Sequence, residues 1–226
     1  AVMTEKHTFI PGNTNVYNKD YSSYSLEDVC LEMSSLGKGD IREPFIEVTY
    51  PNGSSTTDMV FDRAEIIQGK EEYDTLPGSY DDNGEVEQLV IYLKDRNYNL
   101  TLELHYYVYE KCDIITRSAK LVNSGNESVR LERLMSMQLD LNESDYELSF
   151  FNGAWAREMN RSRIPIRAGK YVNESVTGTS SNRANPFFMI GRSSTTEDYG
   201  ECYGFNLIYS GNHYEAAQVN SYGKLR

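Results

Sequence analysis

The stretch LTLELHYYVY, residues 100–109, decides the fold class of this chain. Apolar side chains take every second position from Leu100 onward, and more polar ones such as Glu103 and His105 stand between them. A period of two is typical of a β-strand that has one buried face and one wetter face. We therefore expect residues 100–109 to form a half-buried strand.

The residues that follow extend this strand into a sheet. An apolar-rich run covers residues 114–122, and a polar break follows at Asn123–Asn126. Asparagine and glycine tolerate the positive φ of tight hairpin turns, so the break predicts a turn. Alternation then returns over residues 129–141. We predict three or four consecutive antiparallel strands, which form the spine of a large sheet.

The rest of the chain shows the same pattern of short strands and turns. Strands are predicted at residues 45–50, 59–68 and 87–95, with turns at Pro51–Ser54 and Asp81–Gly84. Many short strands separated by glycine, asparagine and proline turns indicate an all-β sandwich.

The chain shows no internal repeat and no interdomain linker. Residues 1–24 are rich in tyrosine and asparagine without any period, which predicts a loop, and a short helix can follow from Ser25 to Met33. We expect residues 25–226 to form a single β domain.

Composition excludes several classes of partner. The net charge is -12, whereas nucleic acids and anionic membranes require clustered lysine and arginine. No apolar run reaches the roughly eighteen residues that cross a bilayer. Residues 1–20 also lack the apolar core of a secretion signal. We expect neither nucleic acid nor membrane as a partner.

The cysteines favour a reducing compartment. Cys30, Cys112 and Cys202 are far apart, odd in number and without a C-x-x-C spacing. Disulfide frameworks and metal sites need even or closely spaced sets. We predict reduced thiols, no metal, no cofactor and a cytoplasmic protein.

The glycine-rich segment Gly37–Pro44 has two possible interpretations. Two glycines beside Asp40 and Arg42 predict a tight turn held by an ion pair. A phosphate cradle is the alternative, but the spacing differs from G-x-G-x-x-G and no helix follows.

No catalytic constellation is visible. Glycoside cleavage needs two carboxylates at a set separation, and the linear sequence gives no sign of such a pair. A sugar epimerase would use a histidine with a glutamate, which could involve His105 or His213. For His105 we favour an exposed or interfacial strand histidine. We assign no catalytic residue.

Trp155 is the strongest single candidate for ligand contact. It is the one tryptophan of the chain, and an indole can stack on the apolar face of a pyranose ring. The alternative, which the residues alone favour, is a tryptophan buried between sheets or in an interface, with Arg157 and Glu158 as a structural pair.

Several blocks of sequence together resemble a known family. They are Gly37–Pro44, Tyr109–Gly125, Ser136–Asp140, Gly153–Glu158, Gly178–Phe187, Gly200–Phe205 and Tyr209–Asn212. In this order, and from about residue 9 onward, the chain resembles the N-terminal domain of bacterial α-galactosidases of glycoside hydrolase family 36, also called melibiases or raffinose-type α-galactosidases.

The resemblance implies a β-supersandwich of two large, mostly antiparallel sheets. It also implies a longer enzyme that hydrolyses terminal α-galactosyl groups of melibiose and raffinose with retention. The two catalytic aspartates of that enzyme lie on a (β/α)₈ barrel that would follow Arg226. No position here matches them, so we expect the chain to be inactive alone.

The resemblance further implies that the chain packs on its own catalytic barrel and takes part in a homo-oligomer, a tetramer in related enzymes. The early loop, residues 6–24, can reach the rim of a neighbour's substrate pocket. Candidate rim or interface residues are Phe9, Asn13, Tyr17, Tyr24, Asp40, Arg42, Trp155 and Arg157. Two other functions stay open: a stand-alone carbohydrate-binding module and, more weakly, a mutarotase-like sugar epimerase.

Overall fold

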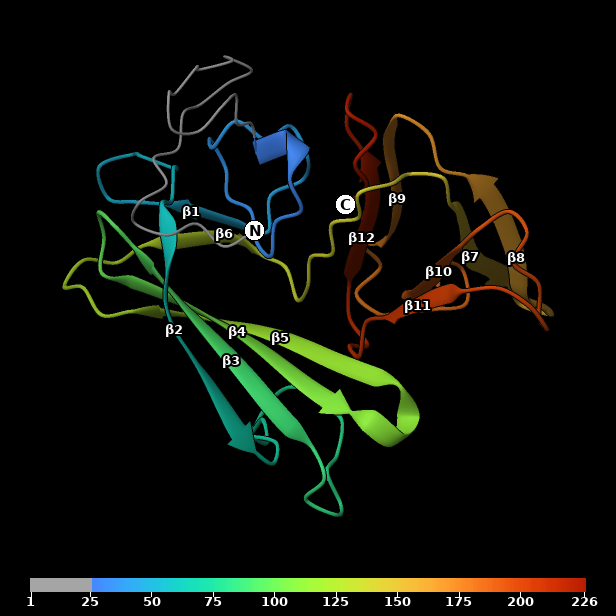
Figure 1. Ribbon diagram of the computed structural model, residues 1–226, viewed down its shortest axis with the longest axis horizontal. Helices are drawn as coiled ribbons and strands as arrows, with labels where there is room; N and C mark the ends of the chain where they lie inside the picture. The colour runs from blue at the N-terminus through green and yellow to red at the C-terminus, as the bar shows by residue number, and fades with distance from the viewer. Residues whose placement is uncertain (1–25) are drawn as a thin grey trace. The chain divides into compact units, whose positions relative to one another are not determined.

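The computed structural model describes residues 26–226, and they form an almost purely β structure (Figure 1). The chain divides into two compact units. The first unit extends to Glu72 and includes Ser79–Asp140, and the second consists of Tyr73–Gly78 and Leu141–Arg226. The all-β class that the sequence predicts is confirmed. The single β-supersandwich domain over residues 25–226 stays a prediction.

The first unit contains a four-stranded sheet, in the order β2-β3-β4-β5, and a two-stranded sheet, β1-β6. All of its strand pairs are antiparallel. The strands are β1 (Ile46–Thr49), β2 (Met59–Gln68), β3 (Glu87–Asp95), β4 (Leu100–Tyr109), β5 (Ile114–Asn123) and β6 (Arg130–Leu134). Two short 3₁₀ helices, η1 (Leu26–Asp28) and η2 (Glu110–Cys112), accompany them.

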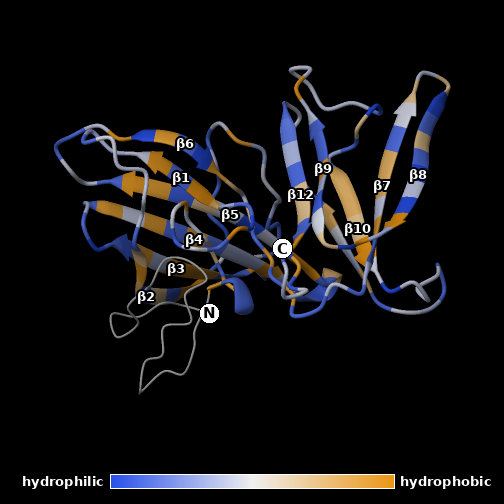
Figure 2. Ribbon diagram, turned by 90° about the horizontal axis from the view of Figure 1, so that it is seen from above, coloured by the Kyte–Doolittle hydropathy of each residue, from blue (hydrophilic) through white to orange (hydrophobic). Residues whose placement is uncertain are grey.

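The register of the β2–β5 sheet sorts its side chains onto two faces. Leu93 pairs with Leu102, whereas Val90 pairs with His105. Because partners across a ladder share a face, we name the two surfaces after these residues. The leucine face bears Leu89, Leu93, Leu102 and Leu104, and the histidine face bears Val90, His105 and Tyr107. Figure 2 shows the resulting alternation of hydrophobic and hydrophilic residues along the strands.

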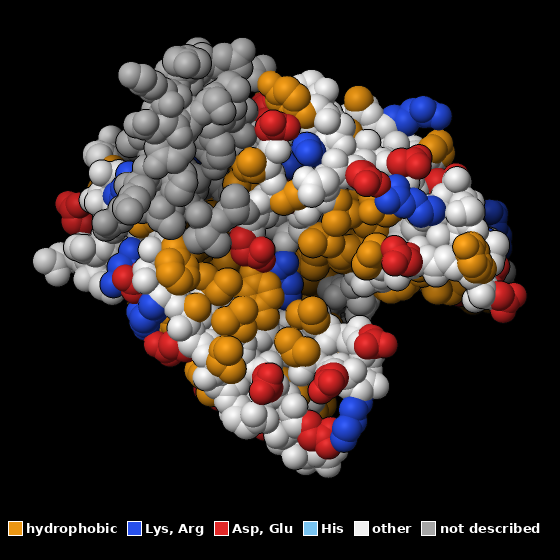
Figure 3. Space-filling view, in the orientation of Figure 1, with side chains coloured by type: hydrophobic (Ala, Val, Ile, Leu, Met, Phe, Trp, Pro, Cys, Tyr) orange, Lys and Arg blue, Asp and Glu red, His pale blue; other side chains and the backbone are white. Residues whose placement is uncertain are grey.

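The leucine face is buried at one end and exposed at the other. Leu93, Leu102 and Leu104 pack with Phe45 and Ile46 in the core of the first unit. Further along the same face, Ile66 is 77% exposed and Ile115 is 61% exposed. Hydrophobic side chains gather over this sheet in Figure 3. The leucine face thus carries exposed apolar side chains beyond its core, with Glu87 and Arg117 beside them.

The second unit is a small sandwich of two sheets. A four-stranded sheet has the order β11-β10-β7-β8, and β12 pairs with β9. Its strands are β7 (Glu147–Ala154), β8 (Arg157–Pro165), β9 (Gly169–Ser175), β10 (Phe187–Gly191), β11 (Cys202–Asn206) and β12 (His213–Val219). Leu148 and Ile190 of the larger sheet share a core with Ala217 and Val219 of β12, so apolar side chains join the sheets.

Two predicted elements differ from the structure. The strand predicted over residues 129–141 ends at Leu134 and pairs with β1 rather than with β5. Its second half is irregular because the side chains of Gln138 and Asp140 turn inward. Gln138 Nε2 donates to the Leu31 carbonyl at 3.0 Å, and Asp140 Oδ2 accepts from the Leu31 N–H at 2.9 Å.

The helix predicted from Ser25 to Met33 is limited to the three residues of η1; Ser25 itself lies outside the described residues. A helix over this span would use its backbone carbonyls internally. Here Arg42 Nη2 donates to the carbonyls of Leu26 and Val29, both at 3.2 Å. These two carbonyls therefore accept from Arg42 instead of from the backbone N–H groups of a longer helix.

The predicted tight turn at Gly37–Pro44 is confirmed. Gly37 and Gly39 have φ of 78° and 80°, which glycine adopts without strain. The Arg42 side chain is fully buried, and its Nη2 lies 3.0 Å from Asp40 Oδ2. Its Nη1 lies 3.3 Å from Asp140 Oδ2. One guanidinium thus joins the turn to two buried carboxylates, and we call these three residues the Arg42 cluster.

Replacing Arg42 with methionine should destabilise the chain by about 3–5 kcal/mol, because two carboxylates would remain buried without their cation. Urea unfolding followed by circular dichroism measures the change. Arg63→Met is the matched control, since Arg63 pairs with Asp62 and Glu65 on the surface, and it should change stability little. Equal effects of the two substitutions would contradict the structural role of the Arg42 cluster.

Candidate functional site

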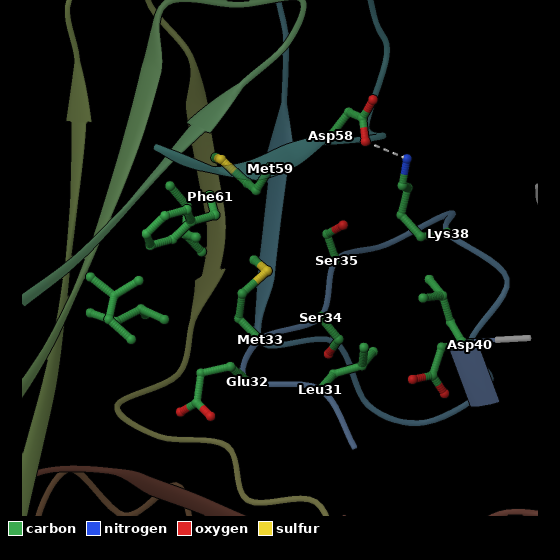
Figure 4. A pocket seen from close by; sticks show the side chains of 14 residues that line it. Leu31, Glu32, Met33, Ser34, Ser35, Lys38, Asp40, Asp58, Met59 and Phe61 are labelled. Atoms are coloured by element: carbon green, nitrogen blue, oxygen red, sulfur yellow. Dashed lines mark hydrogen bonds and ion pairs between the residues drawn. The ribbon is translucent and has the colours of Figure 1, made fainter. Parts of the chain in front are cut away.

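The first unit contains a small cavity beside the buried end of the leucine face. Figure 4 shows Met33, Met59 and Phe61 on one side of it and the ion pair of Lys38 and Asp58, 2.7 Å long, on the other. Its volume is about 50 Å³. A space of this size holds a few water molecules but no sugar or nucleotide. We interpret it as a packing gap.

The second unit contains a larger cavity of about 310 Å³. Ligand sites in proteins begin at about 300 Å³ and combine an apolar lining with a few polar groups. This cavity, which we call the Glu215 pocket, has both. Its apolar part includes Phe150, Tyr171 and Phe188, and its polar part includes Asn152, Asn173 and Glu215.

The two strands β9 and β12 position the polar part. In their antiparallel register Asn173 pairs with Glu215, and Tyr171 pairs with Ala217. Ala217 belongs to the core, so these pairs face into the sandwich. Asn173 Nδ2 donates to Glu215 Oε2 at 2.7 Å and to the Asn185 carbonyl at 2.7 Å. The asparagine therefore fixes the carboxyl in one orientation.

Burial changes the acid–base behaviour of Glu215. Its side chain is only 9% exposed. Removal from water raises the pKa of the carboxyl from 4.5 to about 7, and the hydrogen bond from Asn173 opposes the shift. Glu215 can therefore exchange a proton near neutral pH.

His213 lies beside this carboxyl. Its imidazole is fully buried, and Nε2–H donates to the Ala184 carbonyl at 3.1 Å, which leaves a lone pair on Nδ1 when the ring is neutral. Nδ1 is 3.7 Å from Glu215 Oε1 and has no hydrogen-bond partner among residues 26–226. The pair is close but not directly hydrogen bonded.

This arrangement bears on the epimerase alternative. An acid and a base must both reach the sugar for that chemistry. Glu215 lines the pocket, whereas the buried His213 is not among the lining residues. His213 and Glu215 lie close together, but only Glu215 can contact a substrate in the pocket.

His105 is buried, so the expectation of an exposed or interfacial histidine is wrong. Its side chain lies between Gln88 Nε2, at 2.8 Å from Nδ1, and Glu103 Oε2, at 3.3 Å from Nε2. Tyr107 stacks beside it. Polar neighbours on the histidine face satisfy both ring nitrogens, and this is why a strand position with a polar side chain can be buried.

Trp155 lies at the tip of the hairpin between β7 and β8 and is 91% exposed. The expectation of a tryptophan buried between sheets is therefore wrong. Ala154 pairs with Arg157, so Trp155 and Ala156 form a two-residue turn, with Ala156 at a φ of 57°. A turn this tight points the indole away from the sandwich. Its exposure fits stacking on a ligand or contact with another surface.

The remaining candidates divide into two groups. Asp40 and Arg42 belong to the buried Arg42 cluster, whereas Arg157 is exposed beside Trp155. Phe9, Asn13, Tyr17 and Tyr24 lie outside the described residues. Their placement at a substrate rim or an interface stays a prediction.

The sequence prediction missed Asn173 and Glu215. A signal was present in β12, where His213 and Glu215 are followed at the same spacing by Ala217 and Val219. When polar residues precede apolar ones on the same face of a strand, the polar residues can lie at the edge of a core, beside a pocket. With thirty-four acidic residues in the chain, that signal does not stand out.

Residues 26–226 contain neither a cluster of metal ligands nor a helix suited to a membrane. No three His, Cys, Asp or Glu side chains there gather closely enough to hold a metal ion. None of the helices in this part of the chain has the length and apolar character needed to cross a membrane.

Residues 2–226 match the model of the glycosyl hydrolase family 36 N-terminal domain. The chain is 37% identical over 205 residues to the α-galactosidase AgaA of Geobacillus stearothermophilus. It resembles the crystal structure of an α-galactosidase from Lactobacillus brevis with a TM-score of 0.89 and 38% identity. It also resembles an AgaA variant in complex with raffinose, with a TM-score of 0.90 and 33% identity.

The matches cover most of this chain but a minor part of each relative. The alignment with AgaA covers 90% of this chain and 28% of AgaA. The Lactobacillus brevis structure is matched over 92% of this chain and 28% of its own length, and the raffinose complex over 97% and 31%.

The raised pKa of Glu215 predicts how stability depends on pH. The folded chain keeps this proton up to about pH 7, whereas the unfolded chain loses it near pH 4.5. The stability linked to protonated Glu215 is therefore complete below pH 4.5 and is lost as the pH rises to 7. Glutamine stays neutral throughout. Glu215→Gln should gain stability relative to the unsubstituted chain over this range, by up to about 3 kcal/mol.

Urea unfolding of both proteins at pH 4.5, 6 and 8 measures this difference. Comparing the two proteins at each pH removes the contributions of groups that the substitution leaves unchanged. A difference that stays constant from pH 4.5 to 8 would contradict the raised pKa.

Proposed function

This chain belongs to the glycosyl hydrolase family 36 N-terminal domain family, and on that premise we propose that it is the non-catalytic β domain of an α-galactosidase. Its role is architectural. It packs on the catalytic barrel, contributes to a homo-oligomer and narrows the rim of the active site. The enzyme as a whole removes terminal α-galactosyl residues from oligosaccharides of the melibiose and raffinose type.

The relatives support the substrate class. The relatives named here are α-galactosidases, and the chain spans about 28% of the length of AgaA. AgaA variants have been crystallised with raffinose and with stachyose. We propose that the enzyme to which this domain contributes accepts the same class of sugar.

The two carboxyl groups of the Glu215 pocket do not face each other as glycoside cleavage requires. A retaining glycosidase holds two carboxyl groups about 5–5.5 Å apart across the scissile bond. Glu174 is the other acidic residue among those that line the Glu215 pocket. It follows Asn173 on β9, and successive side chains of a strand alternate between its faces, so its carboxyl does not share a face with Asn173 and Glu215. This geometry supports a domain that leaves the chemistry to another part of the enzyme.

The exposed end of the leucine face is the observation that carries the docking role. Ile66, Val108 and Ile115 lie on that face and are exposed, although the same face forms the core at its other end. Large apolar side chains that gather at the surface on one face of a sheet can mark an interaction site. We propose that the catalytic barrel covers it.

The cysteines fit the cytoplasmic location that we propose for the enzyme. Cys30, Cys112 and Cys202 form no disulfide with one another. Cytoplasmic proteins keep their cysteines reduced, whereas secreted β domains often join them.

Neighbouring isoleucines on β5 provide a matched test of the docking role. Ile115 lies on the leucine face and Ile114 on the histidine face, and both are exposed. In a chimera, this chain replaces the matching region of AgaA. Ile115→Asp should lower the yield of soluble enzyme and the rate on an aryl α-galactoside at least five-fold, because a buried carboxylate would oppose docking. Ile114→Asp should change both by less than two-fold.

The isolated chain serves as the blank in this assay and should show no turnover. Ordinary glycosidase rates from the chain alone would overturn the non-catalytic assignment. Equal losses of soluble enzyme and activity in the Ile115→Asp and Ile114→Asp variants of the chimera would overturn docking through the leucine face. Normal yield and activity of the Ile115→Asp variant would overturn it as well.

A second function, a stand-alone carbohydrate-binding module, is favoured by the exposure of Trp155. The module would stack a sugar on the indole. As part of an enzyme rim or interface, Trp155 should add nothing to sugar binding by the chain alone. We expect Trp155→Ala to leave calorimetric titrations with melibiose and raffinose unchanged. Saturable binding that this substitution abolishes would favour the module instead.

A further inference from the structure

The Glu215 pocket has a built polar end that the architectural role does not use. Asn173 is clamped between the Asn185 carbonyl and Glu215 Oε2, at 2.7 Å from each. Glu215 lies on β12, opposite Asn173 of β9, and Asn185 lies in the loop before β10. Because the clamp already exists without a ligand, little ordering would be needed on binding.

The Glu215 carboxyl keeps unused hydrogen-bonding capacity. An ionised carboxyl can accept about four hydrogen bonds, and a protonated one donates one and accepts others, whereas Asn173 is the one hydrogen-bond donor to Glu215 among residues 26–226. The other oxygen, Oε1, faces His213 Nδ1 at 3.7 Å, beyond hydrogen-bond range. Buried polar groups are normally paired, so an underused carboxyl at the wall of a cavity points to a bound polar partner.

The apolar end of the pocket complements this polar end. Phe150 and Phe188 of the larger sheet and Tyr171 of β9 line it. Aromatic rings pack against the C–H faces of sugars, while amides and carboxyls bond the hydroxyl groups. A pyranose ring has this division into an apolar face and a polar edge, and a volume of about 310 Å³ can admit one ring.

The charge of the pocket favours a neutral ligand. The residues that line the pocket include no lysine or arginine, so the charge of an anionic sugar would have no cationic partner there, whether Glu215 is protonated or ionised. A cationic ligand would need Glu215 ionised, and burial disfavours that form by raising the pKa of the carboxyl to about 7. A neutral hydroxyl can bond the carboxyl in either protonation state.

We propose that the Glu215 pocket binds a single neutral pyranose unit, with Glu215 bonding its hydroxyls and the aromatic side chains packing on its ring. This binding site is separate from Trp155 and lies entirely within the second unit. It does not depend on the docking role of the leucine face.

Titration of the 226-residue chain with methyl α-galactoside and methyl α-glucoside, followed by ¹⁵N NMR, tests the proposal. The expected result is saturable shifts of the Asn173 and Glu215 amides, with the amides of the Trp155 turn unmoved. Galacturonate should bind at least ten-fold more weakly than the neutral glycosides. Absence of saturable shifts with both glycosides, or tighter binding of glucosamine, would overturn the proposal.

Three variants locate the site. Glu215→Leu removes the hydrogen-bonding groups and should weaken binding at least ten-fold, whereas Glu215→Gln keeps them and should stay within three-fold of the unsubstituted chain. Trp155→Ala should not alter binding. Undiminished binding by Glu215→Leu, or loss in Trp155→Ala, would overturn the assignment. If Glu215→Leu does not fold, the shift map of the unsubstituted chain decides alone.

Discussion

The leucine face of the β2–β5 sheet is the constraint on which the first unit depends. Register places Leu93, Leu102 and Leu104 side by side, and these side chains must leave water together. Phe45 and Ile46 cover them at one end, so β1 and the segment before it are held against the sheet. The exposed apolar end of the same face carries the proposed docking role.

The buried Arg42 cluster and the buried Glu215 carboxyl have different roles in this chain. In the Arg42 cluster one guanidinium lies between two carboxylates and also donates to two backbone carbonyls. Glu215 has a single hydrogen-bond donor and a cavity beside it. A cluster of paired charges stabilises one conformation of the chain, whereas an underused group beside open space can take a ligand.

Local patterns predicted the strands well and the long-range contacts poorly. The boundaries of β3 and β4 agree with the sequence prediction because alternation of side chains reports burial of one face. Residues 135–141 alternate equally well but are irregular, since Gln138 and Asp140 bond backbone groups of Leu31, more than one hundred positions away. Alternation in the sequence therefore cannot distinguish a segment that pairs with another strand from one whose side chains bond distant backbone groups.

The sequence by itself determined the all-β class, the tight turn at Gly37–Pro44 and the family, because each depends on neighbouring residues and their order. Only the tertiary structure decided that Trp155 is exposed, that His105 is buried and that Glu215 lines a pocket with Asn173. The reason is physical: the burial of a side chain and the pKa of a carboxyl depend on which distant strands surround it, and a linear spacing does not contain that information.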